Sequence, residues 1–106
     1  MEPVAVEIGV PGEEAARRLS EGLVEERLAA GTKLASSTVP GHYRWEGEVH
    51  ERQYWTVTAL TTRNQVEAIY AYVDARHEDE LLPITVHTFE ASPDYRDWIE
   101  ANVAAA

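Results

Sequence analysis

Apolar and polar residues alternate along residues 4–10, close to the start of the chain. The apolar members of this alternation are Val4, Val6, Ile8 and Val10. Because successive side chains of a strand point to opposite faces, the pattern predicts a strand with one buried face. Pro11 and Gly12 follow directly and predict the end of this strand.

The spacing of an amphipathic helix follows over residues 13–30. Its apolar stripe consists of Ala16, Leu19, Leu23, Val24 and Leu28. Glu13 and Glu14 suit the positive end of a helix dipole. Gly31 stands where a C-terminal glycine is expected, so we predict that it ends this helix.

Two more helices are predicted in the second half of the chain. The first has apolar residues at i, i+3, i+4 and i+7, and Thr62 or Asn64 is expected to cap it. Its apolar residues are Val66, Ile69, Tyr70 and Val73. In the last helix, Ser92 is the expected cap and Pro93 the first helical residue. A strand over residues 84–90 is predicted between the two helices.

The segment HYRWEGEVHERQYW, residues 42–55, predicts a β-hairpin. We expect its first strand over residues 43–49, a loop over 51–53 and a second strand over 54–61, which is rich in strand-forming residues. Residues 32–41 are expected to form a looser connection.

An odd-length loop sets the register of this hairpin. It places Val49 opposite Trp55 and Trp45 opposite Ala59, so that the apolar side chains of the two strands lie on a common face.

The predicted order is β-α-β-β-α-β with an extra C-terminal helix, in a single domain over residues 1–106. This order indicates the α+β class and a ferredoxin-like sandwich, in which two helices pack on one face of an antiparallel sheet. Two helices cannot cover both faces, so aromatic side chains would remain in water. We therefore predict that copies of the chain assemble. The residues expected at the interface or in packing are Tyr43, Trp45, Val49, Trp55, Tyr95 and Trp98.

Composition narrows the partners. The net charge is −10, from 19 acidic and 9 basic residues, and a surface this acidic repels phosphate backbones. Nucleic acid is therefore not an expected partner. No apolar run reaches the length of a membrane span, and the acidic N-terminus differs from a secretory signal, so we expect a cytoplasmic protein without a membrane partner.

The densest cluster of possible metal ligands is the acidic run that begins at His77 and ends at Glu80. Imidazole and carboxylate groups suit Cu²⁺ or Zn²⁺, and His77 and Glu80 are the candidate ligands. The alternative is a solvated, acidic helix end. Weaker candidates are the pair Glu48 and His50 on one strand face, and the single residues His42 and His87.

Catalysis has little support in the sequence. The chain has no cysteine, and Ser36 and Ser37 have no neighbouring histidine and acid. No phosphate-binding loop is present in the sequence. We expect no catalytic residues and no enzymatic activity.

Several motifs, in this order along residues 4–103, resemble the CutA family of divalent-ion tolerance proteins. These motifs are GLVEERLAA, YRWEGEV, a histidine after the second helix, and PDYRDWI. The resemblance implies a ferredoxin-like fold in a homotrimer of the PII-like kind, in which hairpins extend the sheets of neighbouring subunits. It also implies a role in tolerance of divalent metals such as copper, with a cation or small ligand bound in clefts between subunits.

The chain departs from the family pattern at three places. Gly31 replaces a usual cysteine, Leu60 replaces a usual lysine, and acids replace a proline and a tyrosine after His77. A trimeric PII-like scaffold without metal binding is therefore an alternative. A second alternative is a small ferredoxin-like enzyme of the monooxygenase type, because tryptophan and histidine on a sheet face suit that chemistry.

Overall fold

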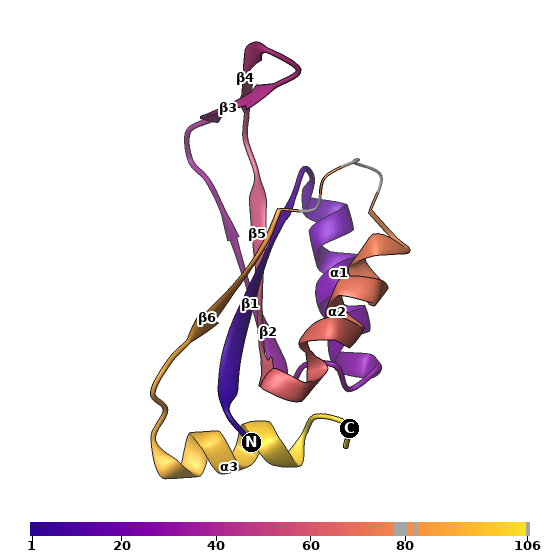
Figure 1. Ribbon diagram of the computed structural model, residues 1–106, viewed down its shortest axis with the longest axis vertical. Coiled ribbons are helices and arrows are strands. Elements are labelled where there is room, and N and C mark those ends of the chain that lie inside the picture. The colour runs from indigo at the N-terminus through magenta and orange to yellow at the C-terminus, as the bar shows by residue number, and fades with distance from the viewer. Residues whose placement is uncertain (78–80, 82, 106) are drawn as a thin grey trace.

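A four-stranded antiparallel sheet forms the centre of the protein (Figure 1). The computed structural model describes residues 1–77, 81 and 83–105. The strand order is β2-β5-β1-β6, and the strands are β1 (Pro3–Val10), β2 (Gly31–Ser36), β5 (Trp55–Thr62) and β6 (Ile84–Thr88). The helices are α1 (Glu13–Glu25), α2 (Val66–Asp74) after the 3-10 turn η1 (Arg63–Gln65), and α3 (Pro93–Ala101). The predicted ferredoxin-like arrangement with an extra C-terminal helix is confirmed.

Helices α1 and α2 lie side by side on one face of the sheet (Figure 1). The alternating residues predicted for β1 point into this layer, where Val4, Val6 and Ile8 are fully buried. The opposite side of the core comes from helix residues such as Leu23 and Ile69, also fully buried. Burial of side chains of this size stabilises the fold by about 1.5–3 kcal/mol each.

Helix α3 crosses the other face at one end of the sheet (Figure 1). Ile99 and Val103 pack there against Ala30 and Leu60, with Ala5 and Phe89 beside them. The predicted cap is confirmed, because the Tyr95 backbone N–H donates to Ser92 Oγ at 3.4 Å. The rest of this face is left uncovered by α3.

The segment expected to be a loose connection begins with a strand instead. Residues of β2 pair with β5 over six positions, from Gly31 with Leu60 to Ser36 with Trp55. The prediction was wrong because Gly31, Lys33 and Ser36 have low strand propensity, and the pairing is decided by the exposed edge of β5. Few residues of this segment are strong strand formers, so only the pairing with β5 reveals the strand.

The first helix also ends earlier than predicted. Glu25 is its last residue, and Arg27 takes the positive φ of 60° that we assigned to a C-terminal glycine. Bonds from the N–H groups of Leu28 and Ala29 to the Leu23 carbonyl close the helix end. Gly31 therefore begins β2 rather than ending α1.

The caps proposed for α2 are not side-chain caps. Thr62 precedes η1 without a capping bond from its side chain, and its hydroxyl donates to Asn64 Oδ1 instead.

A helix of the length and apolarity needed to cross a membrane does not occur among the described residues.

The aromatic segment forms a separate hairpin of β3 (Gly41–Trp45) and β4 (Glu48–Arg52). The chain turns at Glu46 and Gly47, whose φ angles are 52° and 83°. The predicted register is wrong: Trp45 pairs with Glu48 and Val49 with Arg44, whereas Trp55 pairs with Val10 and Ser36. Two successive positive φ angles make a two-residue turn that matches the twist of the strands, and this turn excludes the longer loop.

Candidate functional site

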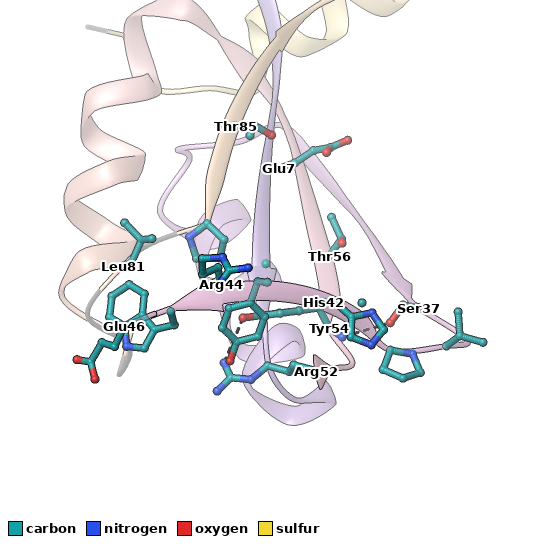
Figure 2. A pocket seen from close by; sticks show the side chains of 17 residues that line it. Glu7, Ser37, His42, Arg44, Glu46, Arg52, Tyr54, Thr56, Leu81 and Thr85 are labelled. Atoms are coloured by element: carbon teal, nitrogen blue, oxygen red, sulfur yellow. Dashed lines mark hydrogen bonds between the residues drawn. The ribbon is translucent and has the colours of Figure 1, made fainter. Parts of the chain in front are cut away.

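The uncovered part of the sheet and the hairpin enclose a pocket of about 910 Å³. Its floor is formed by side chains of β1, β5 and β6 that point away from the helices: Glu7, Thr56 and Thr85. Figure 2 shows Glu7 and Thr85 together on the sheet, and Arg52 and Tyr54 at the hairpin side. The volume is in the range of small-molecule sites.

Aromatic rings and a guanidinium line the hairpin side of this pocket. The Arg52 Cζ atom lies 5.8 Å from the ring centroid of Tyr43 and 5.4 Å from that of Tyr54. Arg52 also donates to the Tyr54 hydroxyl at 3.2 Å. The Tyr43 ring stacks on His50 with the centroids 5.4 Å apart. Cation–π contacts of this kind hold a charged side chain against apolar surface.

Ser37 fastens the base of the hairpin to β5. Its backbone N–H donates to the Tyr54 carbonyl at 3.0 Å, and its hydroxyl accepts from the Tyr54 N–H at 3.2 Å. Its carbonyl accepts from Gln53 Nε2 at 2.7 Å. These bonds place Tyr54 at the junction of the hairpin and the sheet, where its ring faces the pocket.

Of the two predicted metal ligands, His77 follows α2 and is half-buried. Its Nε2 lies 3.4 Å from the carbonyl oxygen of Gly9, a residue at the pocket wall. Since a carbonyl only accepts, Nε2 is the donor, and a metal bound by His77 in this pose would use Nδ1. Glu80 lies outside the described residues.

A second histidine, His87, lies close to an acid, Glu7, that was not predicted as a site residue. His87 on β6 and Glu7 on β1 share the open face, with His87 Nε2 3.6 Å from Glu7 Oε2 and 2.8 Å from Thr85 Oγ1. A single acid on the polar side of an otherwise apolar strand was the available signal for Glu7. The pairing of β1 with β6, which brings the two together, is not visible in the sequence.

In the predicted hairpin pair, Glu48 lies opposite Trp45 and His50 lies opposite Tyr43. His50 stacks on Tyr43, whereas His42 forms the cross-strand pair of the hairpin, its Nε2 3.1 Å from Glu51 Oε1. Within the described ranges, no group of three or more histidine, cysteine, aspartate or glutamate side chains is gathered around one point.

Most residues predicted for interfaces remain accessible in the single chain. Trp45 is 36% exposed, Val49 62%, Tyr95 38% and Trp98 44%. The rings of Tyr95 and Trp98 stack with their centroids 5.6 Å apart on the surface of α3. Trp55 differs, because it packs against the main core.

Fold and site together define a class: a ferredoxin-like α+β protein in which a hairpin projects from the sheet and an open sheet face lines a pocket. The sequence profile described as "CutA1 divalent ion tolerance protein" matches residues 4–102. The chain belongs to the CutA1 divalent ion tolerance family.

Known relatives match over nearly the full chain. The "Divalent-cation tolerance protein CutA" of Thermus thermophilus is 39% identical over 110 residues, covering 96% of this chain and 98% of that protein. The solved structure of the Thermus thermophilus protein has a TM-score of 0.91 at 34% identity, covering 96% of this chain and 99% of that one. CutA from Synechococcus elongatus has a TM-score of 0.87 at 26% identity, covering 97% and 91%.

Proposed function

We propose that this protein works as a homotrimer in tolerance of divalent metals such as copper, and that it binds a divalent cation or a small ligand in clefts between subunits. It acts without catalysing a reaction. The observation that carries the proposal is the hairpin: among the described residues, β3 and β4 pair only with each other and hold aromatic side chains away from the core.

The size of the exposed surface supports assembly. The single chain exposes 6740 Å², whereas a monomer of its mass exposes about 5,900 Å². The excess of roughly 800 Å² is what one partner contributes to a standard interface. The Cα radius of gyration, 14.4 Å, also exceeds the roughly 13 Å of a compact domain of this length. A neighbour's strand edge beside the hairpin would supply both hydrogen bonds and cover.

A threefold ring suits an edge of this kind. When the hairpin of one subunit meets a different surface of the next, the contact is heterologous and the copies must close into a ring or grow into a filament. A closed ring also brings the pocket of each subunit against its neighbour. The number three is what the resemblance to the CutA family implies.

The metal part of the proposal rests on donor chemistry. His77 places an imidazole beside the pocket wall at Gly9, and imidazole suits Cu²⁺ and Zn²⁺. One imidazole does not complete a coordination shell, so further donors must come from the neighbouring acids in the sequence, Glu80 among them, or from a second subunit. The proposal places this activity in the cytoplasm, although relatives include a chloroplastic and a periplasmic protein.

One experiment tests both parts. Light scattering during size exclusion should return three times the chain mass of 11.9 kDa. Calorimetric titration of Cu²⁺ should show binding that His77→Ala weakens by at least about tenfold, since even indirect ligand partners are worth 10–100-fold. A monomer at micromolar concentration contradicts the assembly. Equal Cu²⁺ binding by both proteins removes His77 from the site.

A metal-free trimeric scaffold is the second candidate, and Gly31 supports it. Gly31 stands at the place of the usual cysteine, and a Cβ added there would lie 3.2 Å from the ring of Trp98. The indole therefore crowds the position where a cysteine side chain would begin. A trimer that binds no Cu²⁺ in the titration above is the result expected for this function.

A further inference from the structure

We propose that Glu7, Thr85 and His87 form a divalent-cation site on the open face of the sheet, separate from His77. The inference takes its biological meaning from the proposed divalent-metal function, but the site lies within one chain and does not require the trimer. The ligand class is a borderline divalent cation such as Zn²⁺ or Cu²⁺, for which the His87 imidazole and the Glu7 carboxylate are the main ligands and the Thr85 hydroxyl a weaker, neutral donor.

Two of the distances between these donor atoms bracket the spacing that a metal requires. Around His87 Nε2, Thr85 Oγ1 lies at 2.8 Å and Glu7 Oε2 at 3.6 Å. In a tetrahedral site with bonds of about 2.0–2.1 Å, neighbouring donors lie about 3.4 Å apart. Small rotations of the His87 and Glu7 side chains would therefore bring the three atoms around one ion.

The backbone holds these donors in place. Thr85 pairs directly with Glu7 across β1 and β6, and His87 is two residues further along β6, so all three side chains point to the same face. Strand positions fix a site more closely than loop positions do. No rearrangement of the main chain is needed to gather the ligands.

The surroundings leave room for the ion and for its remaining ligands. The side chains of His87 and Glu7 are 52% and 48% exposed, and Glu7 and Thr85 also form part of the pocket floor. Water or a small ligand in the pocket can complete the coordination shell, as in open metal sites. Lys33 lies on the same face, two strands from Glu7, with Thr58 between them.

The hairpin contains a matched control. His42 and Glu51 form a histidine–glutamate pair with an N···O distance of 3.1 Å, and both side chains are about as exposed as those of His87 and Glu7, at 61% and 62%. Among the described residues, no hydroxyl group bonds to His42 as Thr85 bonds to His87. It tests whether any surface histidine beside a glutamate binds metal equally well.

The experiment is a calorimetric titration of Zn²⁺ into the full chain and into Glu7→Gln, His87→Ala, His42→Ala and His77→Ala. Glu7→Gln and His87→Ala should each weaken one Zn²⁺ site by at least about tenfold, while His42→Ala and His77→Ala leave it intact. Unchanged binding in both Glu7→Gln and His87→Ala overturns the site. Loss of binding in His77→Ala alone overturns it as well and leaves the proposed function standing.

Paramagnetic broadening by Cu²⁺ gives a second, residue-resolved measurement. Amide signals of β1 near Glu7 and of β6 near His87 should broaden first, also in His77→Ala, where the ion of the proposed function is no longer held. Broadening confined to the end of α2 or to the hairpin contradicts the proposal. Thermal unfolding of the variants checks that the fold is intact. We expect unchanged melting temperatures, because the side chains of His87 and Glu7 are half-exposed.

Discussion

At the scale of single residues, charge is unevenly distributed along α1. Its first turn carries Glu13 and Glu14, each in an ion pair four residues on, Arg17 at 3.0 Å and Arg18 at 2.7 Å. Its last turn carries Glu25 near Glu21, without a basic residue. A hydrogen bond with Glu21, followed by repulsion from its charge, raises the pKa of Glu25 above its ordinary value of 4.5. The negative end of the helix dipole acts in the same direction.

The raised pKa of Glu25 predicts how stability depends on pH. A carboxyl whose folded-state pKa is raised contributes stability below its unfolded pKa, and this contribution is lost as the pH rises through the folded pKa. Glu25→Gln should therefore raise the melting temperature at neutral pH and change little below pH 4.5. Thermal unfolding at several pH values measures both effects.

Glu13→Gln is the matched control at the other end of the same helix. It removes a charge that Arg17 and the helix dipole favour, so its effect at neutral pH should be zero or opposite in sign. A lower melting temperature for Glu25→Gln at neutral pH would show that the charge of Glu25 does not destabilise the folded protein.

At the scale of elements, the hairpin depends on its turn. Glu46 and Gly47 both have positive φ, a conformation that glycine adopts freely and other residues adopt at a cost. The turn therefore places one favourable residue beside one unfavourable residue. The chain turns at Glu46 and Gly47, although the alternation of apolar and polar residues continues through these positions.

Gly47→Ala should loosen the hairpin by about 1 kcal/mol, because left-handed backbone costs other residues about 1–2 kcal/mol. Glu46→Asn should tighten it, since Asn-Gly is the preferred pair for such a turn. Hydrogen exchange of the β3 and β4 amides should become about fivefold faster in the first variant and slower in the second.

Gly41→Ala is the control for this pair. Gly41 lies in the same hairpin, does not have a positive φ, and has open space where a Cβ would stand. Its exchange rates should match those of the unmodified protein. Equal rates in Gly47→Ala would mean that the turn conformation does not limit the hairpin.

At the scale of the whole molecule, the two ends of the sheet differ. Helix α3 covers one end through Ile99, whereas the hairpin extends from the other end along the longest dimension of 44 Å (Figure 1). Trp45 is near the tip of this extension and is 36% exposed in the single chain. Tryptophan of this kind is enriched among residues that dominate binding energy at interfaces.

Trp45→Ala should therefore weaken assembly by about 2 kcal/mol or more while leaving the fold of the single chain intact. Light scattering over a dilution series measures the dissociation, and circular dichroism measures the fold. Val24→Ala is the control, because Val24 is 38% exposed on α1, away from the hairpin. An unchanged dilution profile for Trp45→Ala would place Trp45 outside the interface.

The sequence by itself determined the elements whose signal is local. The alternation along β1, the helical spacing from Val66 to Val73, and Ser92 before Pro93 each describe contacts within a few residues, and all three agree with the structure. Their order then indicated the ferredoxin-like class, because few topologies join such elements.

Only the tertiary structure decided the features that depend on distant partners. Strand β2 exists because β5 offers an edge to Gly31–Ser36, a segment with little strand preference of its own. Glu7 and His87 lie close together because β1 and β6 pair, although the two residues are far apart in the sequence. Backbone hydrogen bonds between strands carry no local sequence signal, so the pocket floor and the candidate cation site follow from the pairing of the strands.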